Sequence, residues 1–330
     1  MNASVTDAPH AVNTVSLSVL VAVYQSAAFL RRLVESLAAQ DVPDAEFIFC
    51  DDGSTDGSAD ALEELLDEFG MKARSKVFRH AERLGVARAR QDLLMAAIGE
   101  YFIFADADDF METGMYSGLL AVARWRNADL AWEGWTEVKC DGTKEIHAEA
   151  LDAEPSAAAL RRAVLRDDMH GSLCNKLIRR SFVLKAGASF HDDITCCEDV
   201  DFLMAVLAAN PTVAYSGGCH YHYVRRRDSI TKSDSMPHLA SIRKVVVRLE
   251  NLFTEREDLS AVQMFKMRFR YYASMDFSVP DDAFASYFPE VKSLSDGFSA
   301  KRRVVFWFSA HGMRSLVRFV WHLLHPVERQ

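Results

Sequence analysis

The chain has 330 residues, of which 49% are hydrophobic, and a formal net charge of −9. This composition predicts a folded core rather than a disordered chain, and the acidic balance argues against general nucleic-acid binding, which needs a basic face. The length allows one large domain, or one domain with a smaller appendage.

The first fourteen residues show neither the basic nor the apolar region of a secretory signal, and we expect them to be flexible. No apolar run approaches the roughly 18–20 residues that span a bilayer. The six cysteines form no C-x-x-C pair, so we expect buried thiols in a reducing compartment rather than a zinc or redox site. We therefore predict a soluble protein that stays in the cytoplasm.

Strands and helices alternate over the first part of the chain. Four apolar runs read as strands, at residues 16–24, 46–50, 75–80 and 101–105. Of the three helices between them, the first is predicted to be capped by Ser26, the second to end at Gly70, and the third to run from Val86 to Ile98. This alternation predicts an α/β fold with a parallel or mostly parallel sheet covered by helices.

Polar residues follow three of the predicted strands. Tyr24 ends the first strand, Asp51 and Asp52 follow the second, and Asp106 and Asp108 follow the fourth. Ligands of such sheets bind beyond the carboxyl ends of the strands, where these residues should converge. The sequence therefore indicates a binding site at this edge.

The segment DDGSTDGS, residues 51–58, has two interpretations. It is typical of a turn that leads into a helix cap. Alternatively, the carboxylates of Asp51 and Asp52 accept hydrogen bonds from a nucleobase or a ribose, and the glycines let the backbone approach closely.

The segment FIFADADDF places Asp106, Asp108 and Asp109 directly behind a buried strand. A solvated turn would account for them. Carboxylates two residues apart also suit Mn²⁺ or Mg²⁺, which bind one or two protein carboxylates together with water and phosphate oxygens. The strand context favours the metal interpretation, in which the role of Asp109 stays open.

Residues 111–235 are less regular. A hairpin is predicted within residues 129–149, turning at Asp141-Gly142. In CCEDVDF, Glu198, Asp199 and Asp201 open an apolar helix. Such acids either stabilise the helix N-terminus or include a general base.

Two basic segments, CNKLIRRSF and HYHYVRRRDSIT, supply Lys176 and a run of arginines. They read equally well as exposed charge and as a cationic loop over a pyrophosphate. His222 is more typical of a structural histidine than of a metal ligand.

Taken in order, the motifs resemble the family-2 glycosyltransferases of the GT-A fold. The resemblance covers roughly residues 15–232 and rests on the set VSLSVLVAVYQSAAFLRRLVESLAAQD, FIFCDDGSTDGS, RLGVARARQDLLMAAIGEYFIFADADD, NKLIRRSF and CEDVDF. It implies a Rossmann-like mixed sheet flanked by helices, a nucleotide-sugar donor (a UDP-sugar foremost), a divalent metal and inversion at the anomeric carbon. The chain departs from the family pattern at Gln25 and Gln91, each of which replaces an asparagine.

For the donor, the resemblance implies that Ala22 and Tyr24 close the first strand against the nucleobase. Asp52, beside Asp51, faces the base or its ribose. Arg90 lies where the A-R-N motif of the family has its arginine.

For the chemistry, the resemblance makes Asp106 and Asp108 the D-x-D motif, with Asp108 the direct metal ligand. Asp106 then lies on the ribose side or reaches the metal through water. Asp199 becomes the catalytic base, supported by Glu198. Near the leaving diphosphate it places Lys176 and the 225–231 segment, which contains Arg225, Arg226 and Arg227.

Two other functions compete with transfer of a sugar to a polysaccharide, glycolipid or glycan. A nucleotidyltransferase acting on sugar phosphates uses a similar sheet, but the Gly-rich basic loop typical after its first strand is absent from VAVYQSAAF. A catalytically inactive nucleotide-sugar-binding scaffold would be favoured by loss of the acids, and all three acidic clusters are present.

We divide the chain into a flexible N-terminus (1–14), a glycosyltransferase domain (15–235) and a helical C-terminal region (236–330). Within the domain, 15–110 is the nucleotide-binding half and 111–235 the acceptor half. The tail, residues 301–330, has six Lys or Arg against one acid and is rich in Trp and Phe. It either packs back onto the domain or forms a basic amphipathic helix on an anionic membrane, which would make the protein peripheral at the inner face of the cell membrane and suit a lipid-linked saccharide acceptor.

Overall fold

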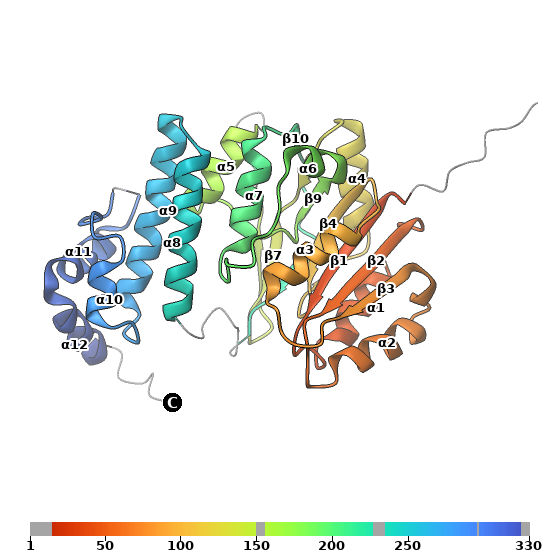
Figure 1. The fold of residues 1–330 in the computed structure, drawn as a ribbon, viewed down its shortest axis with the longest axis horizontal. Helices are drawn as coiled ribbons and strands as arrows, with labels where there is room; N and C mark the ends of the chain where they lie inside the picture. Colours follow the sequence, from red (N-terminus) through yellow and green to blue (C-terminus); the bar gives the residue numbers. More distant parts are fainter. Residues whose placement is uncertain (1–14, 150–155, 227–234, 296, 325–330) are drawn as a thin grey trace, which may run out of the picture.

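The computed structural model describes residues 15–149, 156–226, 235–295 and 297–324. Its centre is a seven-stranded mixed sheet with helices on its faces, followed along the molecule by a layer of helices (Figure 1). The strands lie in the order β10-β6-β9-β4-β1-β2-β3. Their bounds are β1 Leu17–Val23, β2 Ala45–Asp51, β3 Ser75–Arg79, β4 Tyr101–Asp106, β6 Leu130–Trp132, β9 Lys176–Arg179 and β10 Val213–Tyr215. The predicted Rossmann-like mixed sheet is confirmed.

The four predicted strands of the first half pair in parallel, β4 with β1, β1 with β2, and β2 with β3. Strand β2 is buried along its whole length and β1 almost so, as expected for parallel strands covered on both faces. The helices between them are α1 Leu30–Ala38, α2 Ser58–Glu68 and α3 Val86–Ala96.

The predicted cap at Ser26 is wrong. Helix α1 begins four residues later, because residues 26–29 first form a turn in which the Phe29 N–H donates to the Ser26 carbonyl at 2.8 Å. The Ser26 hydroxyl donates to the Tyr24 carbonyl instead of accepting from the helix. Gly70 does end the second helix, with φ of +65°, a conformation that glycine adopts without strain.

A second sheet of four strands, in the order β5-β11-β7-β8, lies beside the first. Its strands are β5 Phe110–Met111, β7 Trp135–Val138, β8 Lys144–His147 and β11 Tyr221–Val224. The predicted hairpin is β7 and β8, which pair antiparallel and turn at Gly142 with φ of +84°. The first part of the predicted hairpin segment, β6, belongs to the main sheet instead. Gly134 lies at this change of sheet, where a Cβ atom would meet the His147 carbonyl oxygen at 2.3 Å.

The described residues from 235 onward are mainly helical. Helix α8 packs on α9 and α7, and α9 packs on α5, so this layer is continuous with the helices of residues 111–235 (Figure 1). The bounds are α4 Met115–Trp125, α5 Ala157–Arg166, α6 Arg180–Ala186, α7 Glu198–Ala208, α8 Ser235–Leu252, α9 Arg256–Met275, α10 Asp281–Ser286, α11 Ala300–Phe308 and α12 Arg314–Leu324.

A buried ion-pair cluster holds the helical layer against α5. The carboxylate of Asp258, on α9, is 1% exposed and is paired with both Arg161 and Arg162 of α5. None of the helices, over the residues described, combines the length and the apolar character needed to cross a bilayer.

Candidate active site

Polar side chains from β1, β2 and β4 meet at the carboxyl edge of the main sheet. Ala22 lies in register with Cys50 of β2 on one side and with Asp106 of β4 on the other. Tyr24, two residues further along, is half-buried, and the guanidinium of Arg83 lies 4.4 Å from the centre of its ring. The three predicted strand ends therefore share one edge.

The two carboxylates at the end of β2 have different surroundings. Asp52 accepts the backbone N–H groups of Leu84 and Gly85, both at 2.8 Å, and its Oδ1 lies 2.8 Å from Nδ1 of His80. Its carboxylate therefore holds the loop before α3. Asp51 is also buried, but its Oδ1 has no hydrogen-bond partner among the described residues. Of the two acids, Asp51 therefore has a buried oxygen that no described residue engages.

The rest of the 51–58 segment is the turn that its composition predicts. Asp56 accepts the Ala27 N–H at 3.0 Å, and the hydroxyl of Ser58 accepts the Ser26 N–H at 2.8 Å, so the segment holds the β1–α1 loop in place. At Gly53, with φ of +71°, a Cβ atom would lie 2.6 Å from the carbonyl carbon of Glu82. The glycine therefore permits close contact between two stretches of this protein's own backbone.

The three acids after β4 are crowded, and they divide into two kinds. Asp109 is buried and accepts the Tyr221 hydroxyl at 2.6 Å and the Val224 N–H at 2.8 Å. Asp109 therefore connects the turn after β4 to β11, and this is a structural role. Burial, followed by the charges of Asp106 and Asp108, raises the pKa of Asp109 well above its usual value.

Asp106 and Asp108 keep partly exposed carboxylates, with side-chain exposures of 37% and 28%. Asp108 pairs with Nε of Arg226 at 3.0 Å. Burial and then repulsion from Asp106 raise the pKa of Asp108, which Arg226 opposes. The two carboxylates therefore lie close enough to repel each other, although each pairs with one arginine.

One arginine joins the end of β4 to the start of α7. Arg90, on α3, is buried; it donates to Asp106 at 3.1 Å and to Glu198 at 2.6 Å. Burial lowers the pKa of Arg90, but Glu198 and Asp106 outweigh burial and hold that pKa above its usual value. The D-x-D segment and the E-D pair, distant in sequence, are therefore in contact through one side chain.

The acids at the start of α7 separate in role. Burial raises the pKa of Glu198 to about 7. The positive charge of Arg90 lowers this pKa, and the negative charge of Asp199 raises it further. Asp199 is half-buried, and its Oδ1 accepts the Val200 N–H at 2.7 Å. Asp201 is buried and accepts from Arg248 of α8 at 2.7 Å, so it fastens two helices together.

Among the predicted cations, Lys176 is buried, and its ammonium donates to the carbonyl oxygens of His170 and Ser172 and to Oδ1 of Asn175, at 2.8–2.9 Å. In this arrangement it holds the 170–175 loop. Burial lowers its pKa. Arg227 lies outside the described residues, and its neighbour Arg226 is the arginine that reaches Asp108.

Sequence reasoning did not single out three residues that support the site. Arg32 donates to the backbone carbonyl of Asp108 at 2.6 Å, Arg83 covers Tyr24, and the Tyr221 hydroxyl holds Asp109. Arg32 and Arg83 are surface-type residues in helix and loop segments, and Tyr221 lies in a strand pattern. For Tyr221, the one available signal in the sequence was its place in the HYHY motif, next to the run of arginines.

His222 is a structural residue. Its ring is stacked on Phe110 with the centroids 4.4 Å apart, and its Nε2 lies 2.7 Å from a carboxylate oxygen of Glu112. Burial lowers its pKa. These contacts fix the pairing of β11 with β5.

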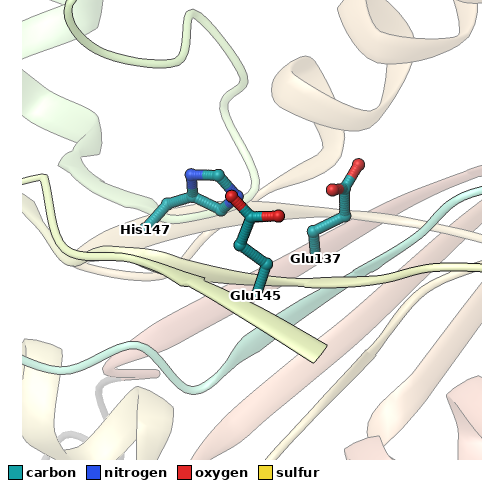
Figure 2. A group of neighbouring side chains, drawn as sticks. All are labelled: Glu137, Glu145 and His147. Atoms are coloured by element: carbon teal, nitrogen blue, oxygen red, sulfur yellow. The ribbon is translucent and has the colours of Figure 1, made fainter. Parts of the chain in front are cut away.

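The D-x-D carboxylates fit a hard divalent cation, because two partly exposed carboxylates are ligands that Mn²⁺ or Mg²⁺ uses. Within the described residues, one trio of possible ligands brings its atoms within 4.8 Å of one another: Glu137, Glu145 and His147, on the β7–β8 hairpin (Figure 2). Arg225 pairs with Glu137 and Lys139 with Glu145, each at 2.6 Å. Asp106 and Asp108 are likewise paired, with Arg90 and Arg226, so the preference for them as metal ligands rests on their place at the carboxyl edge of the sheet.

The chain is similar to known proteins over most of its length. It is 25% identical to the cholesterol galactosyltransferase of Borreliella burgdorferi over 80% of this chain and 75% of that one. It is 24% identical to the poly(ribitol-phosphate) beta-glucosyltransferase of Bacillus spizizenii over 84% of this chain and 47% of the relative, so it spans about half of that protein.

The fold is that of a solved structure, S. aureus TarS residues 1–349 in complex with UDP-GlcNAc. The TM-score is 0.68 at 18% identity, over 96% of this chain and 93% of that one. The family model for glycosyl transferase family 2 matches residues 18–186, which is half of the chain. The chain belongs to glycosyl transferase family 2 and is a glycosyltransferase with the GT-A fold.

Proposed function

We propose that the protein is an inverting glycosyltransferase that moves a sugar from a nucleotide-diphosphate sugar to an acceptor hydroxyl. The observation that carries the proposal is the Arg90 bridge between Asp106 and Glu198. It brings the end of β4, where a donor's phosphates would lie, against the start of α7, where a base would stand.

We assign the donor to the edge formed by β1, β2 and β4. The half-buried Ala22 and Tyr24 line the base side, and Asp51 offers its unpartnered oxygen to an N–H or a hydroxyl of the nucleoside. Asp52 acts indirectly, because it holds the loop that carries Arg83 over Tyr24. The UDP-GlcNAc complex of the structural neighbour supports a UDP-sugar as the first donor to test.

A Mn²⁺ or Mg²⁺ ion would be held by Asp108 and Asp106. When bound, it supplies positive charge to the oxygens of the departing diphosphate. Arg226, beside Asp108, is placed to add charge of the same sign. Lys176 supports the site indirectly, because its ammonium holds the 170–175 loop.

Asp199 is the proposed general base. It takes the proton of the acceptor hydroxyl as the hydroxyl oxygen attacks the anomeric carbon from the face opposite the diphosphate. The C–O bond to the diphosphate breaks as the new one forms, so a single displacement inverts the configuration. Glu198, held by Arg90, positions the start of α7 beside it.

We place a saccharide acceptor, free or lipid-linked, against the aromatic residues of the second sheet. The Trp135 ring centre lies 5.1 Å from that of His170 and 5.9 Å from that of Tyr223. Burial, then Asp109, Asp108 and Asp106, raise the pKa of Tyr223, which places this group next to the acidic turn. The relatives' activities support cell-surface polymer or glycolipid synthesis.

A thermal-shift panel tests the donor and the metal together. Nucleoside diphosphates and nucleotide sugars are compared with and without Mn²⁺, and at least one is expected to raise the melting temperature more with the metal than without it. Asp199→Asn is expected to keep that shift and to lose transfer. Transfer at near wild-type rate by this variant would exclude Asp199 as the base, and release of inorganic pyrophosphate instead of a nucleoside diphosphate would identify a nucleotidyltransferase.

A further inference from the structure

Exposed apolar side chains gather on α12, near the end of the chain. Leu316, Phe319 and Val320 have 51%, 62% and 43% of their surface exposed. Their spacing of three and four residues places them on one side of the helix. Large apolar side chains that form a continuous stripe, rather than lying singly, indicate a surface that something covers.

The opposite side of α12 is already docked on the protein. Arg314, at the start of the helix, is buried and donates to the carbonyl oxygens of Ser274 and Val279 and to a carboxylate oxygen of Asp281. Trp321, two turns later on the same side, is half-buried. Because this docking fixes the rotation of the helix, the apolar stripe is held toward solvent and does not fold back onto the domain.

Helix α11, which contacts α12, also exposes apolar side chains. Phe306 is fully buried and anchors the helix, whereas Val304 and Trp307 are 56% and 46% exposed. The two helices touch and meet at a kink where Gly312 has φ of +83°. Figure 1 shows them together at the end of the molecule opposite to β3. We define the terminal patch as the exposed residues Val304, Trp307, Leu316, Phe319 and Val320.

The charged residues of α11 and α12 are of one sign, and one of them, Arg314, already pairs with the exposed Asp281 of α10. Residues 301–321 contain five Lys or Arg and no Asp or Glu, in a chain whose formal net charge is −9. Lys301, Arg302 and Arg318 are exposed beside the apolar residues. A symmetric dimer through this face would bring like charges together, because a two-fold interface uses the same residues from both copies. An anionic bilayer accepts both features, with apolar side chains at the acyl boundary and cations among the headgroups.

We propose that the terminal patch is an interfacial binding site for a bilayer that contains anionic phospholipid. The rigid attachment of α12 through Arg314 would then orient the whole enzyme on the membrane, instead of tethering it loosely. The proposal does not depend on the transfer reaction, and its test does not use that reaction.

Co-sedimentation with vesicles tests the proposal. The full chain is expected to bind vesicles containing phosphatidylglycerol more tightly than pure phosphatidylcholine vesicles, and less tightly as salt is raised. The double variant Leu316→Ser, Phe319→Ser should weaken binding at least about tenfold, because two apolar side chains no longer enter the interface. Trp125→Ser is the matched control, since Trp125 is 75% exposed on α4, away from the patch, and should leave binding unchanged.

A charge variant separates the two contributions. Lys301→Glu with Arg318→Glu should abolish the preference for anionic lipid while leaving the apolar residues in place. Unchanged melting temperatures would show that both double variants fold. Binding that survives the Leu316 and Phe319 changes, absence of vesicle binding, or a wild-type dimer that these changes dissociate would each overturn the proposal.

Discussion

The ends of β2 and β4 both place acids at the same edge of the sheet, but they use them differently. After β2, Asp52 and Asp56 accept backbone N–H groups and hold loops together. After β4, Asp106 and Asp108 stand in partial solvent, repel each other and face arginine side chains. The first set is engaged by backbone N–H groups, and the second pairs with arginine side chains and stays partly exposed.

The difference shows how to tell a structural acid from a ligand-binding one. A carboxylate that accepts several short hydrogen bonds from the backbone has already been compensated for its burial. A carboxylate crowded by another can be stabilised further by a cation from outside. By this criterion Asp109, bonded to Tyr221 and Val224, belongs with the β2 acids although it adjoins Asp108.

The largest effect is expected from Asp108→Asn. Loss of the metal-facing carboxylate should lower the transfer rate by about 10²–10³-fold, the size seen when one charge-stabilising group is removed from a transition state. Stability should change by less than about 1 kcal/mol, because relief of repulsion from Asp106 offsets the lost pairing with Arg226. Initial rates and denaturant unfolding measure the two quantities.

Asp109→Asn is the matched comparison for this variant. The amide keeps one oxygen but places its NH₂ group against one of two donors, the Tyr221 hydroxyl or the Val224 N–H, so unfolding should become easier by about 2 kcal/mol. The metal-dependent thermal shift should survive. If Asp109→Asn abolished that shift while Asp108→Asn kept it, the division of the β4 acids would be reversed.

The next effect concerns the bridge from β4 to α7. Arg90→Met leaves Asp106 and Glu198 without their shared cation, and the loss should be about 3 kcal/mol, since breaking a buried pair strands a charge. Glu198 can take up a proton, which limits the loss to the low end of the usual range. Denaturant midpoints at neutral pH give the value.

Arg88→Met is the control for the bridge, because Arg88 lies on the same helix and its pair with Asp92 is half-exposed. Its cost should be below about 1 kcal/mol. Equal costs for the two variants would mean that Arg90 does not carry the contact between the two acidic clusters.

The sequence predicts those parts of this arrangement that depend on neighbouring residues. It does not predict contacts between residues that are far apart in the chain. Runs of Val, Ile and Phe place β1, β2 and β4 within a residue or so, and Asp141-Gly142 marks its hairpin, because both are local patterns. The engagement of Asp52 by the N–H groups of residues 84 and 85 has no local signature. The Arg90–Glu198 pair joins residues 108 apart. Such contacts exist only once the sheet is assembled.

Lys176 illustrates the same limit. In the sequence it reads as one cation among several in NKLIRRSF, suited to a diphosphate. In the fold it begins β9, and the strand turns its side chain into the protein, where three acceptors from residues 170–175 surround it. Composition cannot distinguish an exposed lysine from one that is buried by the direction of its strand.

A smaller effect is expected at the β2 end. Asp52→Asn removes one charge-assisted acceptor from the loop before α3 and should cost about 2 kcal/mol of stability. The loosened loop carries Arg83, so the KM for the donor should rise while kcat stays nearly constant. Asp60→Asn, an exposed acid on α2, is the control and should change neither quantity. A fall in kcat with unchanged KM would place Asp52 with the reacting groups instead.

The last effect is a pH dependence that separates Glu198 from the β2 acids. Its folded pKa of about 7 lies above the usual value of 4.5, so between these values the folded protein holds more protons than the unfolded chain. Stability should therefore fall as pH rises from about 5 to 7, with a slope from this residue approaching about 1.4 kcal/mol per pH unit. Glu198→Gln should remove that part of the slope, whereas Asp52→Asn should leave it intact. Unfolding curves at closely spaced pH values measure it, and identical slopes for wild type and Glu198→Gln would show that Arg90 keeps Glu198 ionised throughout this range.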